Sequence, residues 1–130
     1  MVRCRRRDER GAAIVDFVMV VVVLVPLFLG ILQVALTLHA RNTLASAASE
    51  GARYAATSDR GPADGVAKAR DQIEGVLGSS YYDDIVARPI DIDGAPGVEV
   101  VINATVPALG LGGVSVDLTV RGTAVEEFPQ

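Results

Sequence analysis

Cysteine and histidine are almost missing from this chain, which has one of each among 130 residues. With Cys4 alone, no disulfide can form within the chain, so packing must hold any folded part together. With His39 alone, the sequence offers no catalytic constellation, and we expect this ring to lie where an apolar helix leaves a membrane. The aspartates that invite comparison with a calcium loop lack its spacing and closing glutamate: Asp83, Asp84, Asp91 and Asp93. The sequence therefore predicts a protein that is not an enzyme and has no cofactor or metal.

Formal charge is missing from Phe17 to Leu38, a run of 22 residues of which sixteen are Val, Leu, Ile or Phe. As a helix, this run is about 33 Å long, and the hydrocarbon core of a bilayer is about 30 Å thick. A single segment in lipid must be helical, because unpaired backbone amides there cost several kcal/mol. The rest of the chain is too short to bury such a helix in a soluble core. We therefore predict a transmembrane helix over residues 12–38.

Basic residues are concentrated before this helix and scarce after it. Residues 1–11 contain five arginines, and basic residues beside a span stay in the cytoplasm. After His39 the chain has seven Arg and Lys against thirteen Asp and Glu. The flanks predict a cytoplasmic leader over residues 1–11, a single-pass protein in a bacterial-type inner membrane, and an exported remainder. An acidic exported domain argues against a nucleic-acid partner.

Proline and other helix breakers are absent immediately after Leu38, so the helix is predicted to continue from Ala12 to about Thr57. Residues 39–57 would then project beyond the membrane. On this extension a stripe of small and apolar residues recurs at helical spacing: Leu44, Ala48, Ala52 and Ala55. Small residues let another helix approach closely. The stripe can pack on the protein's own domain, on neighbouring subunits, or on both along different lengths.

Residues 58–130 are predicted to form a small α+β domain. A short second helix should begin at Pro62 and end at Gly78, with an apolar face made of Val66, Ala69, Ile73, Val76 and Leu77. From Ile85 the apolar period changes to two, which predicts strands over residues 85–92, 98–106 and 114–121. A turn over residues 93–97 and a connector over residues 107–113 join them. The predicted fold is a long helix, a short helix and a three-stranded antiparallel sheet.

The junction between leader and span contains Gly11, Ala12, Asp16 and Phe17. A carboxylate costs at most about 2.5 to 3.5 kcal/mol at the centre of a membrane helix and less near the interface. Cleavage after Gly11 would create an α-amino group on Ala12, which could pair with Asp16, also between neighbouring subunits. Alternatively, Asp16 sits in the cytoplasmic headgroup layer.

At the start of the apolar helix, Gly11 is followed five residues later by Asp16 and then by Phe17. This pattern resembles the processing site of type IV pilin-like precursors. The segment Glu50-Gly51-Ala52-Arg53 resembles the characteristic motif of TadE-like proteins, minor pseudopilins of tight-adherence (Flp) pilus systems. The resemblance implies that a prepilin peptidase removes the leader after Gly11 and that Asp16 serves processing and assembly. The family has Glu where this chain has Asp16. Implied partners are membrane lipid, the peptidase, other pilin-like subunits and the tight-adherence secretion machinery, with possible presence in the pilus.

Two other interpretations follow from the same residues. An uncleaved single-pass envelope protein would bind a ligand or partner through its outer domain. A secreted domain would begin at Ala48, after the small-residue triplet of residues 45–47 that a signal peptidase accepts. The first residue of the mature protein distinguishes these alternatives from the pilus hypothesis.

Overall fold

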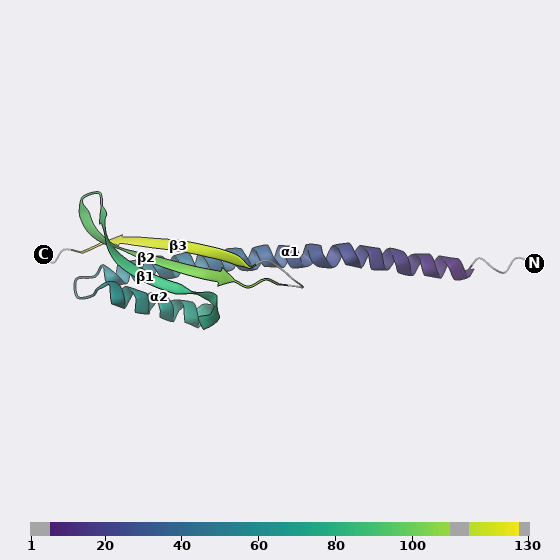
Figure 1. Ribbon diagram of the computed structural model, residues 1–130, viewed down its shortest axis with the longest axis horizontal. Coiled ribbons are helices and arrows are strands. Elements are labelled where there is room, and N and C mark those ends of the chain that lie inside the picture. The colour runs from purple at the N-terminus through teal and green to yellow at the C-terminus, as the bar shows by residue number, and fades with distance from the viewer. Residues whose placement is uncertain (1–5, 110–114, 128–130) are drawn as a thin grey trace, which may run out of the picture.

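One long helix and a small helix-and-sheet domain make up the structure (Figure 1). The computed structural model describes residues 6–109 and 115–127, with side chains from residue 11 onward. The elements in chain order are α1 (Arg6–Ala55), α2 (Pro62–Val76), the 3-10 turn η1 (Ser79–Tyr81), β1 (Asp84–Ile92), β2 (Ala95–Val106) and β3 (Val116–Val125). The predicted α+β class and element order are confirmed.

Helix α1 runs for 50 residues, about 75 Å at the usual rise per residue, and Pro26 lies inside it without ending it. It begins at Arg6, earlier than the predicted Ala12, so residues 6–11 of the predicted leader are already helical. It ends at Ala55 rather than Thr57. The N-terminal half of α1 extends alone, and the C-terminal half lies beside the sheet and α2 (Figure 1).

The sheet is antiparallel throughout, in the order β1-β2-β3. In the central strand the predicted inward-facing residues are all buried: Val98, Val100, Ile102, Ala104 and Val106. Ile102 pairs with Ile85 on β1 and with Val120 on β3, which places three branched side chains in one row of the inner face. Alternation in the sequence thus fixes which face of β2 is buried.

The hairpin between β1 and β2 is tighter than predicted. Its turn is Asp93-Gly94 alone, with φ of 54° and 86°, and the Gly94 N–H donates to Asp91 Oδ1 at 2.8 Å. Two positive φ values are the signature of a two-residue hairpin turn whose twist matches the strands. The predicted turn over residues 93–97 was therefore wrong in its extent, because residues 95–97 already pair with β1.

Strand β3 also differs from its prediction over residues 114–121. It runs from Val116 to Val125, and the predicted start at Val114 and most of the connector lie outside the described residues. Pairing continues past Gly122, where alternation in the sequence breaks, since residues 123–125 pair with residues 97–99 of β2. Gly122 is buried against α1, and this contact explains why a glycine occupies the middle of a strand.

Helix α2 begins with Pro62 in its first turn, and the Gly61 N–H donates to Asp64 Oδ2 at 2.9 Å. Ala69 and Ile73 are buried as predicted, but Val76 is 59% exposed, so its assignment to the apolar face was wrong. Val76 is the last residue of the helix, where the chain turns away at Gly78 with φ 87°.

Tyr82 links α2 to the start of the sheet. Its hydroxyl donates to Glu74 Oε1 at 2.6 Å. This bond raises the pKa of Tyr82, because it favours the protonated phenol; partial burial and the Glu74 charge act in the same direction.

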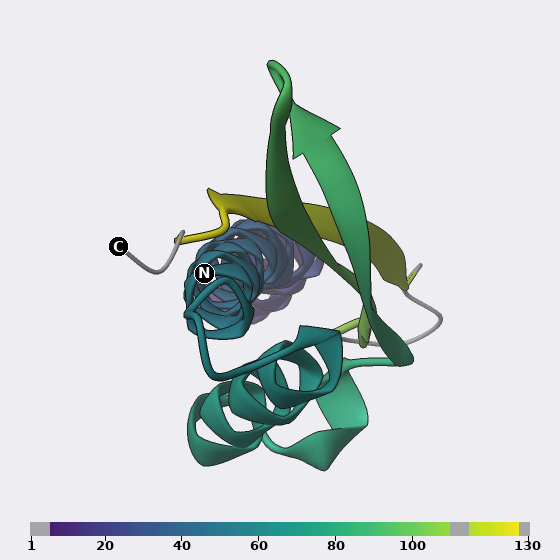
Figure 2. The ribbon, with the colours of Figure 1, turned by 90° about the vertical axis from the view of Figure 1, so that its left-hand side faces the viewer.

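The core lies where α1, α2 and the inner face of the sheet meet (Figure 2). Strands β3 and β2 pack on α1, while β1 packs on α2. The largest completely buried side chains are Leu44, Ile73, Ile102, Val98, Val100 and Val106. Most of the other core residues are alanines, so the helices and the sheet pack with their backbones close together rather than through large side chains.

Candidate membrane and assembly site

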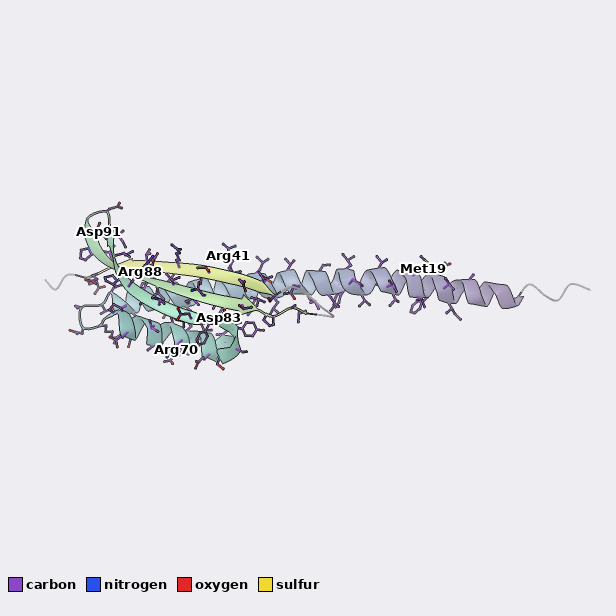
Figure 3. The ribbon with its side chains drawn as sticks, viewed as in Figure 1. Met19, Arg41, Arg70, Asp83, Arg88 and Asp91 are labelled. Atoms are coloured by element: carbon purple, nitrogen blue, oxygen red, sulfur yellow. The ribbon has the colours of Figure 1, made fainter. Side chains whose placement is uncertain are left out.

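The N-terminal half of α1 presents apolar side chains that the rest of the described chain leaves uncovered. Met19 is 65% exposed, and it lies well beyond the domain in Figure 3. Phe17, Val23 and Phe28 are exposed to a similar degree. Among the described residues, α1 is the one helix long and apolar enough to cross a membrane. Such a surface is unfavourable in water at about 25 cal/mol per Å², so it belongs in lipid or against other helices.

At the end of this apolar run nearest the domain, a polar residue of α1 bonds to the domain. The Gln33 side chain contacts the segment after β2: its Nε2 donates to the Pro107 carbonyl at 3.3 Å, and its Oε1 accepts from the Leu109 N–H at 2.6 Å. The segment of residues 107–109 therefore lies beside α1 at a level that the sequence assigns to the membrane. The predicted span over residues 12–38 did not anticipate this contact.

The residues of the predicted processing site lie in the part of α1 farthest from the domain. The side chains of Ala12, Asp16 and Phe17 are exposed, and a Cβ at Gly11 would meet nothing within 4 Å. Ala12 and Asp16 are four residues apart in a helix and so share a face, one turn apart. Among residues 11–109 and 115–127, no side chain forms a hydrogen bond or ion pair with the Asp16 carboxylate. This end of the helix is accessible to another protein.

The Glu50-Gly51-Ala52-Arg53 segment divides between two faces of α1. Gly51 and Ala52 are buried in the core, whereas Glu50 and Arg53 are exposed. The two charged residues border a shallow depression that is also lined by Ser46, Ser49, Tyr54 and Thr57. The Arg60 guanidinium lies 3.6 Å from the centre of the Tyr54 ring, a cation–π contact at the edge of this face. The motif thus has a buried structural half and an outward charged half.

Gly51 and Gly65 allow α1 and α2 to touch backbone to backbone. A Cβ on Gly51 would lie 2.7 Å from the Gly65 carbonyl oxygen, and a Cβ on Gly65 would lie 2.7 Å from the Gly51 carbonyl oxygen. Distances below 3.0 Å are essentially never seen for real Cβ atoms. The glycine of the family motif is therefore explained by the helix crossing within this chain.

The predicted helix-packing stripe faces the protein's own domain. Its four members are at most 2% exposed: Leu44, Ala48, Ala52 and Ala55. Ala48 lies directly beneath Gly122 of β3, where an added Cβ would overlap the Ala48 backbone. In this structure the chain's own domain covers these side chains, so they are unavailable to a neighbouring subunit.

The outer face of the sheet carries several polar side chains that bond to one another. Glu99 of β2, 8% exposed, accepts from Arg88 Nε at 2.7 Å, while the Thr105 hydroxyl bonds Asp83 and Asp117. Asp91 caps the hairpin turn. In the described part of the chain, no three His, Cys, Asp or Glu residues are grouped as a metal site would require. The aspartates of this region serve turns and strand pairing.

Sequence reasoning did not find Gln33, Gly65 or Gly122. Gln33 had a signal, as the one amide in an otherwise apolar run, but its partners lie 74 and 76 residues further along the chain. The two glycines were indistinguishable from turn or connector glycines before the packing was known.

Comparison with known proteins supports the predicted resemblance over the N-terminal third of the chain. The model of the family described as TadE-like protein matches residues 11–53, which confirms the resemblance predicted from the two motifs. The matched region contains both the residues of the predicted processing site and Glu50-Gly51-Ala52-Arg53. No curated protein matches the chain. No solved structure matches it either. The match and the exposed apolar helix together fit a membrane protein associated with a tight-adherence pilus.

Proposed function

We propose that this chain is a membrane-anchored minor pseudopilin or pilus-assembly component of a tight-adherence (Flp) type system. The observation that supports this most is that residues 11–53, which match TadE-like proteins, coincide with the helix whose N-terminal half is bare and apolar. The protein acts by helix packing and subunit assembly rather than by catalysis. It needs no cofactor for this.

Leader removal prepares the helix for assembly. The basic leader stays in the cytoplasm, and a prepilin peptidase cuts after Gly11 at the accessible end of α1. The new α-amino group on Ala12 lies one turn from Asp16 in its own chain, or next to Asp16 of a neighbour in a helical stack. Pairing offsets the cost of taking either charge out of water. Asp16 is one methylene shorter than the glutamate of the family, so it reaches less far toward the amine.

Two surfaces of α1 are available to other pilin-like subunits and to the secretion machinery. The apolar half packs against similar helices in lipid, where close van der Waals contact drives association. The charged half of the family motif, Glu50 and Arg53, is exposed on the extracytoplasmic extension. The exported α+β domain keeps α1 rigid at this level through Gly51 and Gly65.

Sequencing the N-terminus of the protein from the membrane fraction of its host tests the proposal. We expect Ala12 as the first residue. An intact arginine-rich leader would instead indicate an uncleaved envelope protein with a partner-binding outer domain. A start at Ala48 would indicate a secreted domain, although that product would lack Leu44 and Ala47 of the core.

Substitution of Asp16 tests the assembly step separately. We expect Asp16→Asn to leave membrane insertion intact but to reduce recovery of the protein with assembled pilus components, because the amine loses its charged partner. Asp16→Glu, which keeps the charge and restores the family residue, is the matched control and should assemble at least as well as the unsubstituted chain. Equal assembly of all three would contradict a role for this carboxylate.

A further inference from the structure

Residues 107–109 form an apolar segment that is fixed beside the membrane helix. Pro107 is exposed and Leu109 is 40% exposed, and Ala108 lies between them. Two hydrogen bonds hold this segment against α1, one donated by Gln33 to the Pro107 carbonyl and one accepted by Gln33 from the Leu109 N–H. In Figure 1 the end of β2 points along α1 toward the bare half of the helix. An apolar segment held in this place is continuous with the apolar surface of α1.

The depth of Gln33 follows from helix geometry. A hydrocarbon core of about 30 Å takes up about 20 residues of helix. Counted from Phe17, the first residue after the Asp16 carboxylate, those residues end at Leu36. Gln33 would then lie about 5 Å inside the outer boundary, together with the segment bonded to it. The membrane boundary must therefore pass through or very near residues 107–109.

Backbone groups at such a depth need partners, because water is scarce there. The Gln33 amide supplies two of them, as acceptor for the Leu109 N–H and as donor to the Pro107 carbonyl. Pro107 has no N–H of its own. In return, the segment satisfies both ends of the Gln33 amide, which would otherwise be costly in an apolar helix. In water these groups could bond to solvent instead, so the pairing is most valuable to a segment that enters lipid.

Given the membrane anchor of the proposed function, we propose that residues 107–109 form a second membrane contact, in which Pro107 and Leu109 insert into the outer lipid interface and Gln33 holds them at that depth. The occupant of this surface is lipid, at the boundary between headgroups and acyl chains. The domain is thereby fixed in height and tilt against the membrane, since it is attached at both α1 and the end of β2.

Tryptophan fluorescence in lipid vesicles tests this inference directly, because the chain has no tryptophan. The full chain is reconstituted in phosphatidylcholine and phosphatidylglycerol vesicles that contain lipids brominated on the acyl chain. Three single variants are compared: Leu109→Trp, Phe28→Trp within the span, and Val125→Trp at the far end of β3. We expect strong quenching for Phe28→Trp, clear quenching with a blue-shifted emission for Leu109→Trp, and almost none for Val125→Trp.

The three variants test the second membrane contact separately from the membrane anchor. If Phe28→Trp is quenched and Leu109→Trp behaves like Val125→Trp, the helix is inserted but the second contact is overturned. If Phe28→Trp is not quenched either, the anchor and the second contact are both overturned.

The role of Gln33 is tested in the Leu109→Trp background. We expect Gln33→Leu, which removes both bonds and keeps the size, to lower the quenching severalfold. Thr37→Val is the matched control. Among the described residues, the Thr37 hydroxyl bonds only to the Gln33 carbonyl within α1, so this change should leave the quenching unchanged. Unchanged quenching in Gln33→Leu would overturn the positioning role of Gln33.

Discussion

Replacing Gly122 by alanine should destabilise the α+β domain by about 3 kcal/mol or more, at the upper end of the cost of overpacking. The added Cβ would overlap the backbone of Ala48 on α1. A backbone cannot move aside as the end of a flexible side chain can, so β3 and α1 must separate. That separation opens the core around Leu44 and Val120. The unfolding midpoint of the full chain in detergent micelles, followed by amide hydrogen exchange in β2, measures the loss.

Gly75→Ala is the matched control for this prediction. Gly75 lies inside α2, and an added Cβ there would meet nothing within 4 Å. Alanine is the better helix former by roughly 0.5–1 kcal/mol, so this variant should be slightly more stable than the unsubstituted chain. Equal stability of Gly122→Ala and Gly75→Ala would show that β3 does not pack on α1 as described.

Truncation of Leu44 should cost about 2–5 kcal/mol, the usual range for removing a buried leucine side chain. The Leu44 side chain lies on the face of α1 that packs on the sheet and is completely buried, in the core cluster that includes Ile102 and Val120. The same substitution also decides what the small-residue stripe does. If the stripe serves the protein's own core, Leu44→Ala lowers stability even for isolated copies in micelles.

Leu38→Ala provides the comparison for Leu44→Ala on the same helix. Leu38 is 54% exposed, beyond the core, so its truncation should leave the domain's unfolding midpoint almost unchanged. A midpoint for Leu44→Ala equal to that of Leu38→Ala, with weakened association between copies, would place the stripe between subunits and contradict the packing described.

The fold could be predicted where one physical signal dominates. The uncharged run of residues 17–38 is explained by lipid alone, and the alternation in β2 by a sheet with one buried face. The sequence prediction ended strand β3 at Arg121, because a glycine inside a strand weakens it and therefore indicates a strand end. In the structure Gly122 is required because α1 packs directly against it, and this tertiary contact cannot be read from the local sequence. Val76 was misassigned because periodicity gives the face of a helix but not where the core ends.

The candidate site shows the same limit. Gly11, Asp16 and the Glu50–Arg53 segment were predicted from spacing and resemblance, and the family match covers all of them within one continuous helix. The division of that segment into buried Gly51 and Ala52 and exposed Glu50 and Arg53 required the position of α2. The Gln33 contact joins residues 74 and 76 positions apart, and no local pattern encodes it.

Fractionation of the full chain from its native host tests the central claim most directly, namely that the bare half of α1 lies in a membrane. We expect the protein to sediment with membranes, to resist extraction by high salt and alkaline carbonate, and to be released by detergent. Salt and alkali remove proteins held by charge, whereas a helix with about 20 apolar residues in lipid stays inserted. Recovery of the full chain as a soluble monomer without detergent would contradict the membrane anchor and the pilus role that depends on it.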